Sequence, residues 1–180
     1  MRSLQLVFFT ILMPMLLLGQ NRVPQQIESL RSSGADFIPV ELLRYQTNDL
    51  NTKQVDGLVA GTLLSVNFEA IDQLQRSNLS TISMELPVDE GESIILDLVE
   101  HDILTPGFQL YESANPDVPV NYTPGKFYRG MVRGAPYSVA SLSVFNDEVM
   151  AIVSNKRGNF VLGKLKGDRD NTHILYNDQD

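Results

Sequence analysis

Alternating apolar and polar residues in the second half of the chain predict a series of β-strands joined by tight turns. Successive side chains of a strand point to opposite faces, so a period of two indicates a strand with one buried face. Turn signals separate the alternating runs, for example Gly-Ala-Pro at 134–136. Strands are expected near 81–86, 93–99, 108–111, 118–122, 127–132, 138–145, 148–153, 159–164 and 172–176. This regular spacing predicts a mainly β domain, an antiparallel β-sandwich or a barrel-like fold.

One short helix is predicted ahead of these strands. Asn67 is suited to cap its first turn, and Phe68, Ile71 and Leu74 share one face at helical spacing. Segment 55–66 is compatible with either a strand or a helix, because its apolar residues fit both patterns. Segment 37–45 is expected to form one strand, and Pro87 is expected to end the strand that begins at 81.

The N-terminus has the pattern of a secretory signal peptide. Residues 4–18 are almost wholly apolar, and Arg2 is the only charged residue before Arg22. This run is shorter than the roughly 20 apolar residues that span a bilayer. We therefore expect a signal peptide at 1–19 with cleavage after Gly19, an uncleaved anchor being the alternative. The remaining chain should then be secreted, that is, periplasmic or extracellular.

The chain that follows divides into two parts. Residues 20–35 are polar and are predicted to be a flexible N-terminal segment. Residues 36–180 are long enough to bury one core and are predicted to form one β-rich domain.

Composition limits the classes of partner and chemistry. The sequence contains 22 acidic and 14 basic residues, for a formal net charge of −8. An acidic surface argues against binding to nucleic acid, which needs clustered Lys and Arg. After signal cleavage no membrane partner is expected. The sequence has no cysteine, which excludes thiol catalysis and thiolate metal sites.

Residues that could carry out catalysis are few and scattered. The two histidines, His101 and His173, do not form a His-Glu-x-x-His motif, and each is expected at a strand edge or on the surface. Acidic residues cluster at 89–92 and again at 97–102, where we expect a solvated turn and a polar strand face rather than the paired acids of a glycosidase. The sequence assigns no catalytic, cofactor-binding or metal-ligating residue, and the chain is predicted not to be an enzyme.

Two groups of residues are compatible with a binding site or with a structural role. Oxygen-bearing side chains gather near the C-terminus, with Asp168 and Asp170 the candidates for calcium binding. Their spacing lacks the glycine and the distal glutamate of an EF-hand. Five aromatic residues fall at strand spacing, where we expect core packing rather than a sugar-binding patch: Phe127, Tyr128, Tyr137, Phe145 and Phe160.

The segment from 127 to 165 resembles the propeptide of reprolysin-like zinc metallopeptidases, in the version that precedes secreted bacterial enzymes. The positions that carry the resemblance are Tyr128, Gly130, Val132, Gly134, Ser138, Ala140, Leu142 and Ser143. A weaker resemblance extends over about 81–176. The chain departs from the family by having Ala151 where a glycine is common. Because it also lacks cysteine, no thiolate could occupy the zinc ion of a peptidase.

The resemblance implies a non-catalytic prodomain that masks the active site of a zinc peptidase or assists its folding. The implied partner is the catalytic domain, either in the same precursor, of which this chain would be the N-terminal part, or as a separate chain. The alternative is a free-standing extracellular β-sandwich that serves as a binding or adhesion module. We further expect that valine in place of Gly130 or Gly134 impairs folding, because glycines in turns and close strands allow tight backbone geometry.

Overall fold

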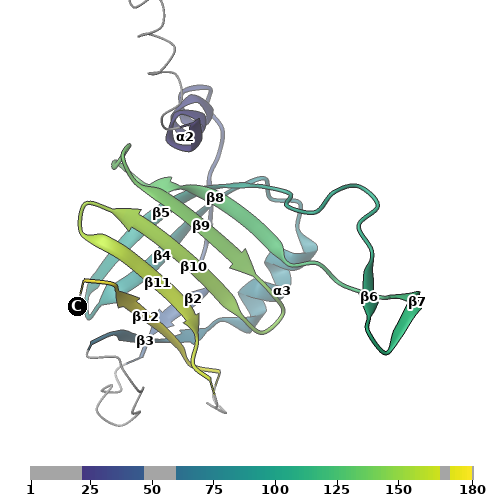
Figure 1. The fold of residues 1–180 in the computed structure, drawn as a ribbon. Helices are drawn as coiled ribbons and strands as arrows, with labels where there is room; N and C mark the ends of the chain where they lie inside the picture. The colour runs from purple at the N-terminus through teal and green to yellow at the C-terminus, as the bar shows by residue number, and fades with distance from the viewer. Residues whose placement is uncertain (1–21, 47–59, 167–170, 180) are drawn as a thin grey trace, which may run out of the picture.

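The computed structural model describes residues 22–46, 60–166 and 171–179, and its main feature is a curled β-sheet (Figure 1). The ten strands of this sheet have the order β1-β4-β5-β8-β9-β10-β11-β12-β3-β2. They are β1 (Ile38–Val40), β2 (Leu43–Tyr45), β3 (Thr62–Val66), β4 (Thr81–Asp89), β5 (Glu92–Glu100), β8 (Lys126–Val132), β9 (Val139–Val144), β10 (Val149–Asn155), β11 (Gly158–Lys164) and β12 (His173–Asn177). The prediction of a mainly β, barrel-like domain is confirmed.

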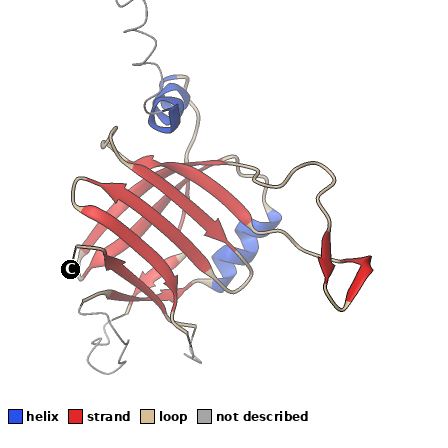
Figure 2. Cartoon of the chain, in the orientation of Figure 1, coloured by secondary structure: helices blue, strands red, loops and turns tan. Residues whose placement is uncertain are grey.

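The other elements lie outside this sheet. Two helices, α2 (Arg22–Ser32) and α3 (Phe68–Arg76), pack against it, and β6 (Leu110–Glu112) and β7 (Asn115–Val120) form a separate two-stranded sheet (Figure 2). No helix in the described ranges is long and apolar enough to cross a membrane.

The sheet curls into a half-barrel because its two edge strands are consecutive in the chain. Strand β1 pairs in parallel with β4, whereas β2 pairs antiparallel with β3 at the other edge. Only Glu41 and Leu42 separate the two strands. The Thr62 hydroxyl donates a hydrogen bond of 2.6 Å to the carbonyl oxygen of Val88, which joins β3 to β4 across the gap. The single strand predicted at 37–45 is thus two short strands.

Alternation along the strands fills the inside of the curl with apolar side chains. In β9, Ala140, Leu142 and Val144 are buried, and the interior cluster includes residues from every strand from β8 to β12. The opposite face of β9 is also partly apolar, but it is open to solvent, since Val139 on that face is 47% exposed. A strand in the middle of an antiparallel sheet can therefore still have one face in solvent.

Helix α3 closes one end of the interior, as its apolar spacing predicted. The Asn67 side chain accepts a hydrogen bond from the backbone N–H of Ala70 at 3.2 Å, which is the expected N-cap. Ile71 and Leu74 are buried in the core, whereas Phe68 is largely exposed. The Gln75 side chain donates a hydrogen bond of 2.7 Å to the carbonyl oxygen of Val144 and so ties the end of the helix to β9.

Helix α2 corrects the prediction of a flexible segment at 20–35. Pro24 and Ile27 are buried, and they are three residues apart, so both lie on the helical face that packs against β5 and β8. Pro24 is tolerated because the N–H groups of a first helical turn have no partner within the helix. The helix ends at Ser32, and Gly34 just beyond it has φ of 82° and donates its N–H to the carbonyl oxygen of Arg31.

Two further boundaries differ from the sequence prediction. Strand β4 continues past Pro87 to Asp89, because its register shifts between these residues and the missing N–H of proline is accommodated at this irregularity. The segment 55–66, for which a strand and a helix were both possible, forms strand β3 from Thr62 onward. Residues 55–59 lie outside the described part of the chain. The predicted signal peptide at 1–19, Asp168 and Asp170 lie outside it as well.

Candidate functional site

A strand edge or a surface position was expected for His173; it is the first residue of β12 but is fully buried, so the surface alternative is wrong. Its Nε2 accepts a hydrogen bond from the backbone N–H of Val149 at 3.1 Å, so the proton of the neutral ring is on Nδ1. The Nδ1–H donates to the carbonyl oxygen of Asn171 at 3.0 Å. Burial lowers the pKa of His173, and the hydrogen bond with Asn171 only partly offsets this effect. Both ring nitrogens are therefore engaged in structural contacts.

This arrangement predicts a pH dependence of folding stability. The unfolded chain binds a proton on His173 near its ordinary pKa of about 6.5, whereas the folded chain resists protonation down to a lower pH. The free energy of unfolding should therefore decrease as pH falls below about 6.5, by at most about 1.4 kcal/mol per pH unit from this residue. Glu148 and the ion pair between Asp147 and Lys164 lie near the ring and contribute smaller effects.

The measurement is urea unfolding of the native protein and of His173→Gln at several values from about pH 7.5 to 5. The variant should be less stable at neutral pH but should lose the histidine contribution to the pH slope. His101→Gln is the matched control, since that side chain is exposed, and it should keep the native slope. Equal slopes for the native protein and His173→Gln would contradict a neutral buried imidazole.

His101 lies on the surface, as expected. It follows the end of β5, its side chain is exposed, and its backbone N–H donates to the carbonyl oxygen of Phe127 at 2.8 Å. The two imidazoles thus belong to different places in the fold: His173 is enclosed between strands, and His101 lies at the rim of a surface groove.

Asp97 is buried and ion-paired, which corrects its assignment to a polar strand face. Arg31 of α2 approaches its carboxylate at 2.6 Å, and Arg133 at 2.8 Å. Arg133 also donates to the Ser83 hydroxyl at 2.7 Å. Burial by itself raises the pKa of Asp97, but the hydrogen bonds and charges of Arg133 and Arg31 outweigh burial, so the net pKa is lowered. The carboxylate remains ionised and holds α2 on the outer face of the sheet.

The other acidic side chains have ordinary surface roles. Asp89 is exposed at the end of β4, next to the predicted turn, and Glu92 at the start of β5 pairs with Arg157. Asp102 accepts a hydrogen bond from the backbone N–H of Leu104 at 2.9 Å. None of these contacts brings two carboxyl groups together for acid and base catalysis.

The candidate calcium ligands Asp168 and Asp170 lie outside the described part of the chain. Asp178, which is described, accepts hydrogen bonds from the backbone and the side chain of Asn159 at 2.9 and 2.6 Å. These bonds hold the end of β12 to β11 and lower the pKa of Asp178. Within the described ranges, no group of three or more His, Cys, Asp or Glu side chains is placed to hold a metal ion.

The segment that resembles the propeptide family forms β8, β9, β10 and β11 in succession. A Cβ atom at Gly130 would collide with the backbone carbonyl of Asp97 on the paired strand β5. Gly134 adopts φ of 76° in the β8–β9 turn. The Ser138 hydroxyl accepts from the N–H of Val132 at 2.8 Å and donates to the carbonyl oxygen of Ala135 at 2.6 Å, which fixes the same turn. The motif positions thus have specific backbone roles.

The aromatic residues of this segment pack as predicted in most cases. Tyr128 and Phe160 belong to the buried core, and Phe127 and Phe145 meet edge to face with ring centroids 5.9 Å apart. Tyr137 corrects the expectation, since it is 76% exposed in the β8–β9 turn. These five aromatic side chains do not form a shared exposed surface on which a sugar could stack.

The segment 101–125, which we call the arm, leaves the sheet after β5 and returns at β8 (Figure 1). It contains the β6–β7 hairpin, and almost every side chain from 101 to 124 is exposed. At its base the rings of Phe108 and Tyr122 meet edge to face with centroids 6.3 Å apart. The two short strands predicted at 108–111 and 118–122 are present but pair with one another outside the main sheet.

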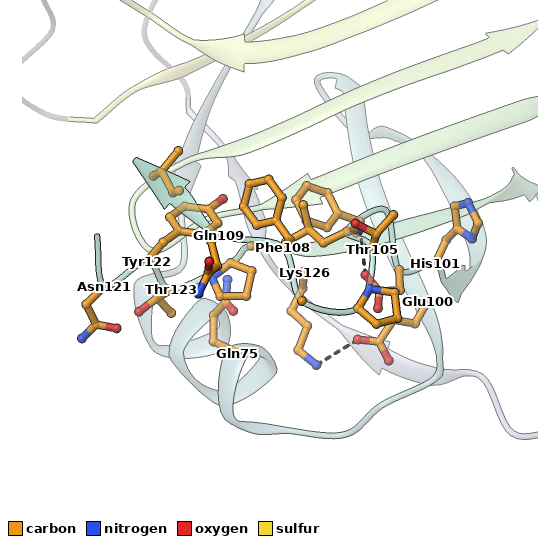
Figure 3. A pocket seen from close by; sticks show the side chains of 18 of the residues that line it. Gln75, Glu100, His101, Thr105, Phe108, Gln109, Asn121, Tyr122, Thr123 and Lys126 are labelled. Carbon is orange, nitrogen blue, oxygen red and sulfur yellow. Dashed lines mark hydrogen bonds and ion pairs between the residues drawn. The ribbon is translucent and has the colours of Figure 1, made fainter. Parts of the chain in front are cut away.

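An open groove of about 1170 Å³ lies between the arm and the body of the domain (Figure 3). Gln75 of α3 and the ion pair of Glu100 with Lys126, at 2.9 Å, belong to the body side. Phe108 and Tyr122 belong to the arm side. The groove combines apolar rings with a few polar groups, a composition that is typical of binding sites.

Sequence reasoning missed this groove because alternation identifies a strand without identifying its sheet. A usable signal was present in the prolines of the arm, at 106, 116, 119 and 124, since proline is rare within central strands. The ion pairs of Asp97 gave no comparable signal, because Arg31 is 66 residues away in the sequence.

Comparison with known proteins adds no family assignment. No protein-family model matches the chain, and no curated protein matches it. The proposed function is therefore based on the residues of the chain and their geometry.

Proposed function

We propose that the chain is a non-catalytic, propeptide-like domain of a secreted zinc metallopeptidase, which binds the catalytic domain and masks its active site or assists its folding. The observation that carries this proposal is the arm, which projects from a well-packed domain and presents exposed apolar side chains beside a groove. Such an element suits an inhibitory domain, because a protrusion can enter the concave active site of an enzyme.

The residues that could act chemically support a non-catalytic role. His173 is held by two backbone groups, and Asp97 is held by two arginines. The β8–β11 segment uses its glycines and Ser138 for backbone geometry. We expect the chain from Gln20 onward to fold without added metal and to show no peptidase activity on casein.

The test combines this domain with a reprolysin-type zinc peptidase domain secreted by the same organism. The domain is titrated into the active peptidase while cleavage of a fluorogenic peptide is followed, and it is also added while the denatured peptidase refolds. Lower activity in the first assay, or faster recovery of activity in the second, is the expected result. A well-folded domain that changes neither, or zinc-dependent cleavage by the domain alone, would overturn the proposal.

A free-standing extracellular binding module is the second candidate. The observation that favours it is the open outer face of β9 and β10, where Val139, Met150 and Ile152 are exposed. Apolar side chains gathered on one exposed sheet face often indicate a contact surface. This candidate gains support if the domain affects no peptidase and remains stable on its own.

A further inference from the structure

The arm concentrates exposed apolar side chains in a short stretch of chain. Six of the fourteen exposed large apolar side chains in the described ranges lie in it: Ile103, Phe108, Leu110, Tyr111, Val118 and Tyr122. The side chain of Val118, for example, is 53% exposed. Because exposed apolar area is unfavourable in water, a cluster of this kind in a projecting element indicates a surface that is covered by a partner.

The charge of the arm has one sign. The sequence has no Lys or Arg between Arg76 and Lys126. Within the arm, Asp102, Glu112 and Asp117 are acidic. Lys126, where β8 begins, is already paired with Glu100. An apolar surface whose unpaired charges are carboxylates favours a partner with basic groups and disfavours the phosphates of nucleic acids and anionic lipids.

The backbone of the hairpin offers one suitable edge for strand pairing. A two-stranded sheet is marginally stable alone and has an unpaired edge on each strand. Strand β7 contains Pro116 and Pro119, which lack an N–H group. Strand β6 contains no proline, and Leu110 together with the segment before it lines the groove.

We propose that the arm and its groove bind an extended polypeptide segment of a partner protein, in which Lys or Arg residues alternate with apolar ones. The segment pairs with the free edge of β6, its apolar side chains cover those of the arm, and its cations face Glu112 and Asp117. Backbone pairing provides affinity in this mode, and the side chains provide selectivity. This inference goes beyond the proposed function, because it holds for a peptidase partner and for any other protein that presents such a segment.

The experiment measures binding of two labelled probe peptides to the native protein by fluorescence anisotropy. One short peptide alternates Lys with Leu and Thr, and the other has Glu in place of every Lys. At about 0.15 M salt, where screening is effective beyond about 8 Å, the basic peptide should bind at least about tenfold more tightly than the acidic one. Hydrogen exchange of β6 (Leu110–Glu112) should slow when the basic peptide is bound.

Matched variants separate the arm from general acidity. Glu112→Gln with Asp117→Asn removes two charges from the arm, and Glu85→Gln with Glu90→Gln removes two charges elsewhere. Val118→Ser and Ile152→Ser form an apolar pair, since both side chains are 53% exposed. The arm variants should each weaken binding of the basic peptide about fivefold or more, and the controls less than about twofold.

Equal affinity for both peptides, failure of the basic peptide to bind, or equal effects of arm and control variants would each overturn the inference. The assay contains no peptidase, so its result is separate from the test of the proposed function. Peptide binding at the arm without any effect on a peptidase would overturn only the propeptide role.

Discussion

Gly130→Ala is expected to lower the free energy of unfolding by about 4 kcal/mol or more, or to prevent folding. The added Cβ would overlap the carbonyl oxygen of Asp97 and would lie 2.8 Å from the Cα of Leu98. Both atoms belong to the backbone of β5, which pairs with β8 along this register. The clash cannot be relieved by a change of side-chain rotamer, so the ladder between two central strands would have to open. Gly130→Val should be at least as damaging.

Two other glycines provide graded controls in urea unfolding. Gly134 has open space around it but adopts φ of 76°, so Gly134→Ala should cost about 1–2 kcal/mol through backbone strain alone. Gly163 in β11 has neither a close neighbour nor a positive φ, and Gly163→Ala should be neutral or stabilising by up to about 1 kcal/mol. Similar stability of the Gly130 and Gly163 variants would show that β5 and β8 do not approach as described.

Asp97→Ala is expected to destabilise the domain by about 3 kcal/mol and to release α2 from the sheet. Removing one member of a buried ion pair typically costs 3–5 kcal/mol, and the lower end applies because Arg31 and Arg133 can reach water when freed. Their side chains are 39% and 42% exposed. Asp97 is the shared anion of both arginines, so its loss affects α2 and the β8–β9 turn together.

Arg31→Met distinguishes the release of α2 from the overall loss of stability. It removes the contact between Asp97 and α2 and leaves Arg133 paired with Asp97. Hydrogen exchange of residues 23–32 should show exposure of α2 in both variants, with the smaller loss of global stability in Arg31→Met. Asp72→Ala removes a surface ion pair with Arg76 and should change stability by less than about 0.5 kcal/mol. Unchanged protection of α2 in Asp97→Ala would contradict this role of the ion pair.

Local sequence patterns were sufficient for the elements whose determinants are close in the chain. The alternation of β8 through β12 and the turns between them predicted this run of strands within one or two residues. The cap at Asn67 and the spacing of Ile71 and Leu74 predicted α3. These features depend on neighbouring residues, through side-chain period and hydrogen bonds within a turn.

Part of the candidate site could also be predicted from the sequence. The strands of the arm were expected at nearly their observed positions, and the glycine at 130 was expected to allow a close backbone approach. Alternation could not show that the hairpin leaves the sheet, and the prolines of β7 were the only local signal against a place in the central sheet. Only the position of β5 and β8 as neighbours, which places the ends of the arm side by side, forces residues 101–125 to project.

The sequence by itself determined a mainly β domain with one capped helix. It gave both histidines the same expectation, a strand edge or the surface, and only His101 is exposed. The tertiary structure decided that Asp97 and His173 are buried, that α2 is a docked helix, and that β1 and β2 occupy opposite edges of one sheet. The physical reason is distance along the chain. A buried charge is stable only beside its partners, and the arginines that pair with Asp97 come from two segments that the fold brings together.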